Sequence, residues 1–89
     1  MYVSLFGKNK EGKEYQVVLL CQKQDVKRLQ KKTGDKYAQI KELIDIGLTT
    51  LKNYEAEPTF FIIWEKYIYQ SMDKFTPEYI YKKLYEPSV

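Results

Sequence analysis

The chain has 89 residues, of which 44% are hydrophobic, 16% aromatic and 30% charged, which suits one small folded domain and argues against a disordered chain. The net charge is +3, but residues 1–41 hold ten Lys/Arg and four Asp/Glu, while residues 42–89 hold five and eight. The absence of histidine excludes histidine bases and histidine metal ligands, and a single cysteine excludes an internal disulfide and a four-ligand zinc site.

The first predicted elements are extended. The stretch YVSLF, residues 2–6, is followed by a polar loop with two glycines and then by EYQVVLLC, residues 14–21. The second run is β-branched and apolar, which predicts a strand; the first forms either its hairpin partner or a loose arm. Both faces of strand 14–21 are apolar, so the pattern predicts burial on both sides.

A short helix is predicted over residues 22–33. Its apolar stripe is thin, because only Val26 and Leu29 contribute to it. Gly34 is suited to end this helix, since glycine accepts the left-handed conformation found at helix C-termini.

A longer helix is predicted over residues 36–54, where apolar residues recur at spacings of three and four. Asp35 is a candidate cap for its first turn. Gly47 lies inside the apolar stripe, at a cost of about 1 kcal/mol relative to alanine. A close approach by another helix, for example at a dimer axis, would account for a glycine at this position.

Two further helices are predicted in the C-terminal third, over residues 59–73 and 77–85. Aromatic and aliphatic residues of TFFIIWEKYIYQSM trace a wide helical stripe in the first. Thr76 and Pro77 provide an N-cap and a first-turn proline for the second. The predicted fold class is therefore mostly α with a short β element.

The chemistry of the chain predicts a binding protein and not an enzyme, with no cofactor and no metal. Cys21 lies in an apolar strand and is expected to fill space in the core. The sequence contains neither a phosphate-binding glycine loop nor a carboxylate pair that stands out from surface charge. It also lacks an apolar run of about 18 residues, so we expect a cytoplasmic protein with no membrane partner.

The run VKRLQKKTGDKYAQIKELIDIGLTTL resembles the ribbon-helix-helix family of DNA-binding proteins, and with the preceding strand the resemblance covers residues 14–54. The matching features are an apolar pair in the first helix, Val26 and Leu29, and the turn Thr33–Gly34. They continue in the second helix with Ile40–Leu48, which has the form I-K-E-L-I-D-I-G-L.

The resemblance implies an intertwined homodimer. Residues 1–54 would form a ribbon-helix-helix-like domain preceded by an extended arm or hairpin, and residues 55–89 an aromatic helical extension packed on it. A strand from each subunit would enter the DNA major groove as a two-stranded ribbon. The expected function is a small dimeric transcriptional regulator or repressor of double-stranded DNA, encoded by a plasmid or phage, or an antitoxin.

The same resemblance assigns residues to DNA. The start of the second helix would direct backbone N–H groups at a phosphate. Neighbouring lysines would add salt-dependent attraction, and a strand residue would contact a base. The expected DNA-binding residues are Gln16, Lys31, Lys32, Lys36 and Tyr37.

Two alternatives stay open at this point. A helix-turn-helix frame can be placed on residues 29–43, with Gly34 in the turn. In the other, the chain is a protein-binding module that docks on a partner protein or inhibits a host protein through its tyrosine-rich C-terminal helices. The expected protein-interface residues are Val17, Leu19, Tyr79, Tyr81 and Tyr85.

Overall fold

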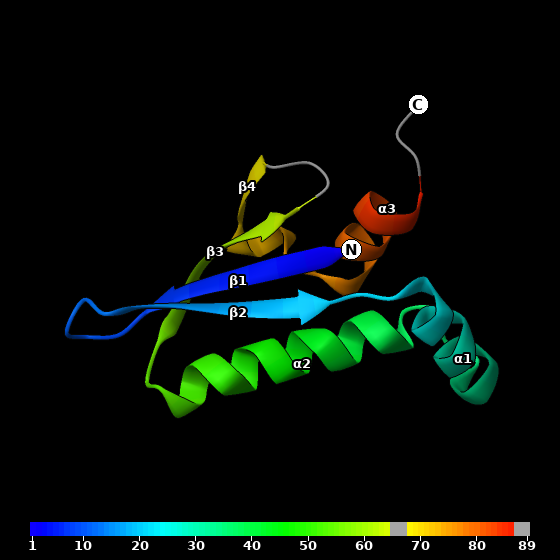
Figure 1. Ribbon diagram of the computed structural model, residues 1–89, viewed down its shortest axis with the longest axis horizontal. Coiled ribbons are helices and arrows are strands. Elements are labelled where there is room, and N and C mark those ends of the chain that lie inside the picture. The colour runs from blue at the N-terminus through cyan, green and yellow to red at the C-terminus, as the bar shows by residue number, and fades with distance from the viewer. Residues whose placement is uncertain (65–67, 87–89) are drawn as a thin grey trace.

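The computed structural model describes residues 1–64 and 68–86 of the chain. Four antiparallel strands form one sheet in the spatial order β2-β1-β3-β4 (Figure 1). Residues of α2 and α3 share one hydrophobic core with one face of this sheet. The strands are β1 (Tyr2–Lys8), β2 (Glu14–Leu20), β3 (Glu57–Ile63) and β4 (Ile68–Ser71). The helices are α1 (Lys23–Thr33), α2 (Ala38–Asn53), the short 3-10 helix η1 (Met72–Lys74) and α3 (Pro77–Tyr85).

This architecture corrects the expected fold class. The chain is not mostly α with one short strand, because a four-stranded sheet organises it in the order β-β-α-α-β-β-α. The helix predicted over residues 59–73 is wrong: its N-terminal part is β3, and its C-terminal part is β4 and η1. Residues 65–67 of that prediction lie outside the described residues. A short continuous apolar run fits a helix and a buried strand equally well, and here the aromatic and β-branched composition favoured the strand.

The N-terminal stretch is a hairpin partner and not a loose arm. β1 pairs antiparallel with β2, and Val3 lies opposite Leu19. The connecting loop is closed by the Asn9 side chain, whose Oδ1 accepts hydrogen bonds from the backbone N–H groups of Glu11 (3.0 Å) and Lys13 (2.9 Å). β1 is thereby fixed as a central strand, because its other edge pairs antiparallel with β3.

The core lies between the sheet and the helices. Alternate residues of the strands face α2 and α3, and the most deeply buried of them are Leu5, Phe61 and Ile63, each 0% exposed. Ile40 and Leu51 of α2 complete the same cluster. Burial of large apolar side chains is the main stabilising contribution in a domain of this size.

Two glycines let α2 and β3 approach the sheet's central strand. A Cβ at Gly47 would lie 3.2 Å from side-chain atoms of Leu5 and Leu19, and a Cβ at Gly7 would lie 2.9 Å from the carbonyl oxygen of Glu57. The close approach expected at Gly47 therefore occurs, but it is between α2 and the sheet of the same chain.

The helical pair follows the predicted boundaries closely. Gly34 has φ 76° at the end of α1, and its N–H donates to the carbonyl of Gln30 at 2.8 Å. α1 packs on α2 and buries Val26. It lies at one end of the molecule, beyond the C-terminal end of β2 (Figure 1).

Candidate functional site

The face of the sheet opposite the helices is the principal candidate site, and we call it the open face. Strand alternation places on it the even-numbered residues of β1 and β2, Phe60 and Ile62 of β3, and Tyr69 of β4, and Trp64 follows directly after β3. Five of the eight exposed large hydrophobic residues of the described chain lie there: Tyr2, Val18, Leu20, Trp64 and Tyr69. Antiparallel sheets commonly present polar residues on an uncovered face, so an apolar uncovered face is a candidate binding surface.

The open face is apolar at one end and charged at the other. Across the strands, Leu20 lies beside Tyr2, and the Trp64 N–H donates to the Tyr2 carbonyl at 3.1 Å. At the hairpin end, Lys8 lies opposite both Glu14 and Glu57, and its Nζ is 3.7 Å from Glu14 Oε1. The apolar end forms a band across the strands, which we call the apolar band: Tyr2, Val18, Leu20, Ile62, Trp64 and Tyr69.

A column of three aromatic rings adjoins this band and shares Tyr69 with it. The rings of Phe6 and Phe60 stack with centroids 4.5 Å apart, and those of Phe60 and Tyr69 stack at 4.7 Å. Phe60 therefore has a neighbour on each side. The column links β1, β3 and β4 and stiffens the open face, since aromatic pairs of this kind contribute about 0.5–1.5 kcal/mol each.

Ser4 is the polar centre of the open face. It is 0% exposed although it lies on the uncovered side of β1. Its Oγ accepts hydrogen bonds from Trp64 Nε1 at 2.7 Å and from Gln16 Nε2 at 3.1 Å. The indole and the amide are thus held down over the hydroxyl, which orients Trp64 within the apolar band.

A second candidate is the basic surface of α1. The helix carries five Lys/Arg and one Asp, and all five cationic residues are exposed. Arg28 Nη2 lies 3.2 Å from Asp25 Oδ1 and pairs with this single carboxylate of the helix. The other cations of α1 have no acidic residue on the same helix, so its net charge is strongly positive. Lys31 and Lys32, expected to contact DNA, lie in its last turn.

The expected phosphate position at the start of α2 contains a carboxylate of the chain itself. Asp35 Oδ1 accepts the Tyr37 N–H at 2.9 Å, and Asp35 Oδ2 lies 2.7 Å from Lys41 Nζ. The Lys41 ammonium and the Tyr37 N–H together hold the pKa of Asp35 below its ordinary value. An exogenous phosphate would have to displace this carboxylate.

The structure brings the remaining expected residues of the turn against α3. Lys36 Nζ lies 5.1 Å from the ring centroid of Tyr37 and 5.3 Å from that of Tyr81. Tyr81 also contacts Tyr85, with ring centroids 5.2 Å apart. Two residues expected to bind DNA and two expected to bind protein thus form one intramolecular cluster. Such cation–π contacts contribute about 0.5–1 kcal/mol at exposed sites.

The other expected interface residues have separate surroundings. Tyr79 donates its hydroxyl hydrogen to Gln70 Oε1 at 2.9 Å and is half-buried. Leu19 is buried in the core, and Val17 is half-buried on the same face of β2. Gln16 lies on the open face, away from α1. Burial on both sides of strand 14–21 is not observed, because Val18 and Leu20 are 56% and 43% exposed.

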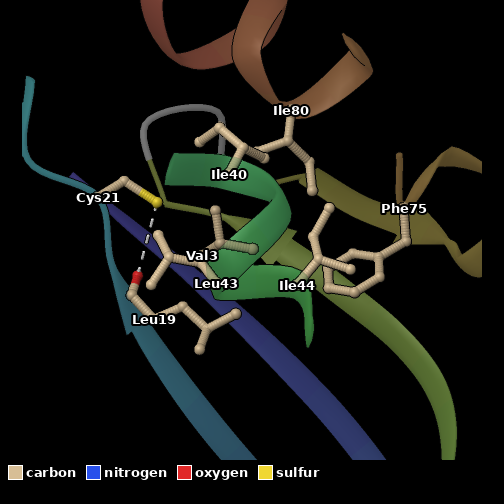
Figure 2. Close-up of a pocket in the computed structure, with 8 residues that line it drawn as sticks. All are labelled: Val3, Leu19, Cys21, Ile40, Leu43, Ile44, Phe75 and Ile80. Atoms are coloured by element: carbon tan, nitrogen blue, oxygen red, sulfur yellow. Dashed lines mark hydrogen bonds between the residues drawn. The ribbon is translucent and has the colours of Figure 1, made fainter. Parts of the chain in front are cut away.

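Cys21 lies in an apolar pocket between the sheet, α2 and α3 (Figure 2). The pocket has a volume of about 10 Å³, close to the space of one water molecule, and its lining is apolar. Burial raises the pKa of the Cys21 thiol to about 11. Its Sγ lies 4.0 Å from the Leu19 carbonyl oxygen. The thiol is therefore protonated and shielded, unlike a nucleophilic cysteine.

No protein-family model, curated protein or solved structure matches the chain. Within residues 1–64 and 68–86, no three Cys, Asp or Glu side chains are grouped so as to hold a metal ion. No helix in the same part of the chain is long and apolar enough to cross a membrane.

The residues of the apolar band were not identified from the sequence as a site. Tyr2 and Trp64 belong to runs that place large apolar residues on both faces of their strands, so alternation alone does not tell which face is covered. The available signal was the excess of apolar residues: one layer of helices cannot cover both faces of a sheet.

Proposed function

We propose that this protein is a protein-binding module whose apolar band receives an amphipathic helix of a partner protein. The observation that carries the proposal is the gathering of five exposed large hydrophobic side chains on one uncovered sheet face. A sheet covered by helices on one face completes a three-layer arrangement when another helix covers the other face.

The dimensions of the apolar band favour a helix as the occupant. It spans two rows of side chains along the strands, about 7–10 Å, and crosses four strands, about 19 Å. An α-helix is about 10 Å wide, and 13 residues of it extend for about 20 Å. The apolar stripe of a helix of three to four turns therefore matches the band in both directions.

Nucleic-acid stacking is a weaker interpretation of the same aromatic residues. Base stacking requires an accessible ring face and nearby cations. Phe60 is stacked on both sides by Phe6 and Tyr69, at 4.5 and 4.7 Å. The cation Lys8 is paired with Glu14 at the far end of the face. An apolar protein surface needs neither a free ring face nor a cation.

Site-specific photo-crosslinking in the producing cell tests the proposal. A photoreactive residue replaces Tyr69 on the open face or, as control, Leu48, an exposed residue on α2. We expect a protein adduct from position 69 and none from position 48, with the crosslink mapping to an amphipathic helix. A synthetic peptide of that segment should bind the native chain and lose at least about tenfold in affinity for Tyr69→Lys. Equal adducts at both positions, or none at position 69, would contradict the proposal.

We propose double-stranded DNA binding as a second candidate function, and it is carried by the charge of α1. Its five exposed cations favour contact with a phosphate backbone. A gel shift with random duplex DNA at low salt tests it. The triple variant Lys27→Ala, Lys31→Ala, Lys32→Ala should bind DNA more weakly than the native chain. The variant Tyr69→Lys should bind DNA as tightly as the native chain. If the native chain gives no shift at low salt, this candidate function is contradicted.

A further inference from the structure

The two outer strands of the sheet differ in how their free edges are protected. β4 has four residues, Ile68–Ser71, and passes directly into η1. β2 has seven residues, and from Tyr15 to Leu20 it contains no charged residue and no proline. Natural proteins protect sheet edges with short strands, charges, prolines or bulges. β4 is short, whereas β2 has none of these protections along Tyr15–Leu20.

The free edge of β2 presents a defined set of backbone groups. The N–H groups of Cys21 and Asn9 donate across the hairpin to Met1 and Lys13, at 2.8 and 3.0 Å. Hydrogen-bonded and non-hydrogen-bonded positions alternate in an antiparallel pair. The odd-numbered residues of β2 therefore bond to β1, and the N–H and C=O groups of Gln16, Val18 and Leu20 point to the free edge. No other described strand pairs with this edge.

A groove accompanies this edge. It lies between β2 and the C-terminal half of α2, has a volume of about 390 Å³, and is lined by Tyr15, Gln16, Val17, Val18, Thr50, Leu51 and Tyr54. α2 runs alongside β2 (Figure 1). Ile46, Thr50 and Tyr54 follow one another at spacings of four along α2, so they share one side of the helix. Ile46 and Tyr54 are 47% and 55% exposed.

We propose that the free edge of β2 pairs antiparallel with β2 of a second copy of this chain, about a twofold axis near Val17. In this register Gln16 lies opposite Val18 of the second copy, and both present outward N–H and C=O groups. Even-numbered residues face even-numbered residues, so the two helix layers lie on the same side of one eight-stranded sheet. The Ile46–Thr50–Tyr54 sides of the two α2 helices then face each other across the groove.

The charge of the edge suits contact with an identical edge. In a twofold interface the residues nearest the axis lie beside their own copies, so charged residues at the centre would oppose pairing. From Tyr15 to Leu20, and at Ile46, Thr50 and Tyr54, the described chain presents no ionised side chain. The cations of α1 lie beyond the end of the strand.

The size of the contact is sufficient for a specific dimer. The edge is about 24 Å long, and the sheet and helix layers together are about 20 Å thick. The contact therefore covers about 480 Å² per copy, or about 1,000 Å² in total, which is the minimum area expected of a biological interface.

Light scattering and hydrogen exchange of the full chain test the pairing. We expect a concentration-dependent dimer of the 10.7 kDa chain. In the dimer, the amides of Gln16, Val18 and Leu20 should exchange at least about tenfold more slowly than after dilution to monomer. The amides of Val17 and Leu19 should be protected in both states, because they bond to β1.

Val18→Pro provides the matched substitution. It removes one outward N–H, which an edge strand tolerates, and should raise the dimer dissociation constant at least about tenfold. Val18→Thr keeps the N–H and the branched shape and should leave the dimer intact. If Val18→Pro does not fold, the exchange pattern of the native chain decides.

A chain that stays monomeric at all concentrations would overturn the inference. So would a dimer whose Gln16, Val18 and Leu20 amides exchange as in the monomer, which would indicate pairing through the open face. The inference does not rest on the proposed helix-binding function. Tyr69→Lys should leave the dimer unchanged, so loss of helix binding and loss of dimerisation are measured separately.

Discussion

The two faces of the sheet are built from neighbouring residues of the same strands, yet only one is covered. On the helix face, Leu5 and Phe61 are 0% exposed, whereas on the open face Val18 and Tyr69 are 56% and 65% exposed. Both faces carry large apolar side chains, although the open face also carries Ser4, Lys8, Glu14 and Gln16. Under the proposed function, hydrophobic residues therefore serve two tasks in this chain, folding on the helix face and recognition on the open face.

The largest expected effect separates these tasks. Phe61→Ala should lower the free energy of unfolding by about 3–5 kcal/mol, because it leaves a cavity between the sheet and the helices. Tyr69→Ala removes an aromatic side chain from the open face and should cost about 0.5–1.5 kcal/mol, the contribution of its stacking on Phe60. Urea denaturation of both variants measures the contrast. Similar losses would mean that the open face is covered within the folded chain.

A smaller effect is expected from closing the approach to β1. Gly7→Ala places a Cβ 2.9 Å from the backbone carbonyl of Glu57 and should destabilise the fold by about 1–3 kcal/mol. At Gly47 the nearest atoms belong to the side chains of Leu5 and Leu19, at 3.2 Å, and alanine gains about 1 kcal/mol of helix propensity. Gly47→Ala should therefore be the milder change in thermal unfolding. The reverse order would show that the backbone of β3 shifts more easily to admit a Cβ than the side chains of Leu5 and Leu19 do.

The polar centre of the open face should contribute less again. Ser4→Ala removes the acceptor of the Trp64 and Gln16 hydrogen bonds, and should cost about 1 kcal/mol. Tryptophan fluorescence should shift as the indole loses its fixed hydrogen bond. Ser4→Thr keeps a hydroxyl and serves as control. An unchanged emission spectrum in Ser4→Ala would show that the hydrogen bond to Ser4 does not determine the environment of Trp64.

The smallest effect concerns the turn before α2, which belongs to neither face. The pKa of Asp35 is lowered by its hydrogen bonds with Lys41 and the Tyr37 N–H. The stabilisation is therefore present above the ordinary value of 3.8 and is lost as pH falls through the lowered pKa. Asp35→Asn should be slightly less stable than the native chain at neutral pH, and the two should converge in acid. A constant difference across this pH range in urea titrations would contradict the assignment.

Sequence patterns predicted the elements whose signals are local. The glycine after α1, the apolar spacing of α2 and the Thr76–Pro77 start of α3 are determined by neighbouring residues, and the predicted boundaries agree with the structure to within two residues. The prediction failed at β3 because its apolar residues follow one another without interruption, so their pattern fits both the helical repeat and the strand repeat. What decides between them is pairing with β1, and Val3 lies opposite Ile63 at the other end of the sequence.

The candidate site could not be predicted for a related reason. The expected DNA-binding site combined Gln16, Lys31 and Lys36. In the structure Gln16 bonds to Ser4, and Lys36 contacts Tyr37 and Tyr81. The apolar band comes from all four strands, which form two hairpins that are distant in sequence. Its identification requires knowledge of which face the helices cover, and that is a property of the tertiary structure.

The central position of β1 also orders the events of folding. The hairpin of β1 with β2 is local and can form early. The other edge of β1 cannot pair until β3 is available, and β3 is synthesised after both α1 and α2. Until then the N–H and C=O groups on that edge have no strand partner, beside an apolar surface. Non-local strand pairing is slow, so closure of β1 on β3 should limit the folding rate. Chains halted before residue 57 would expose two strand edges and should depend on chaperones to avoid aggregation.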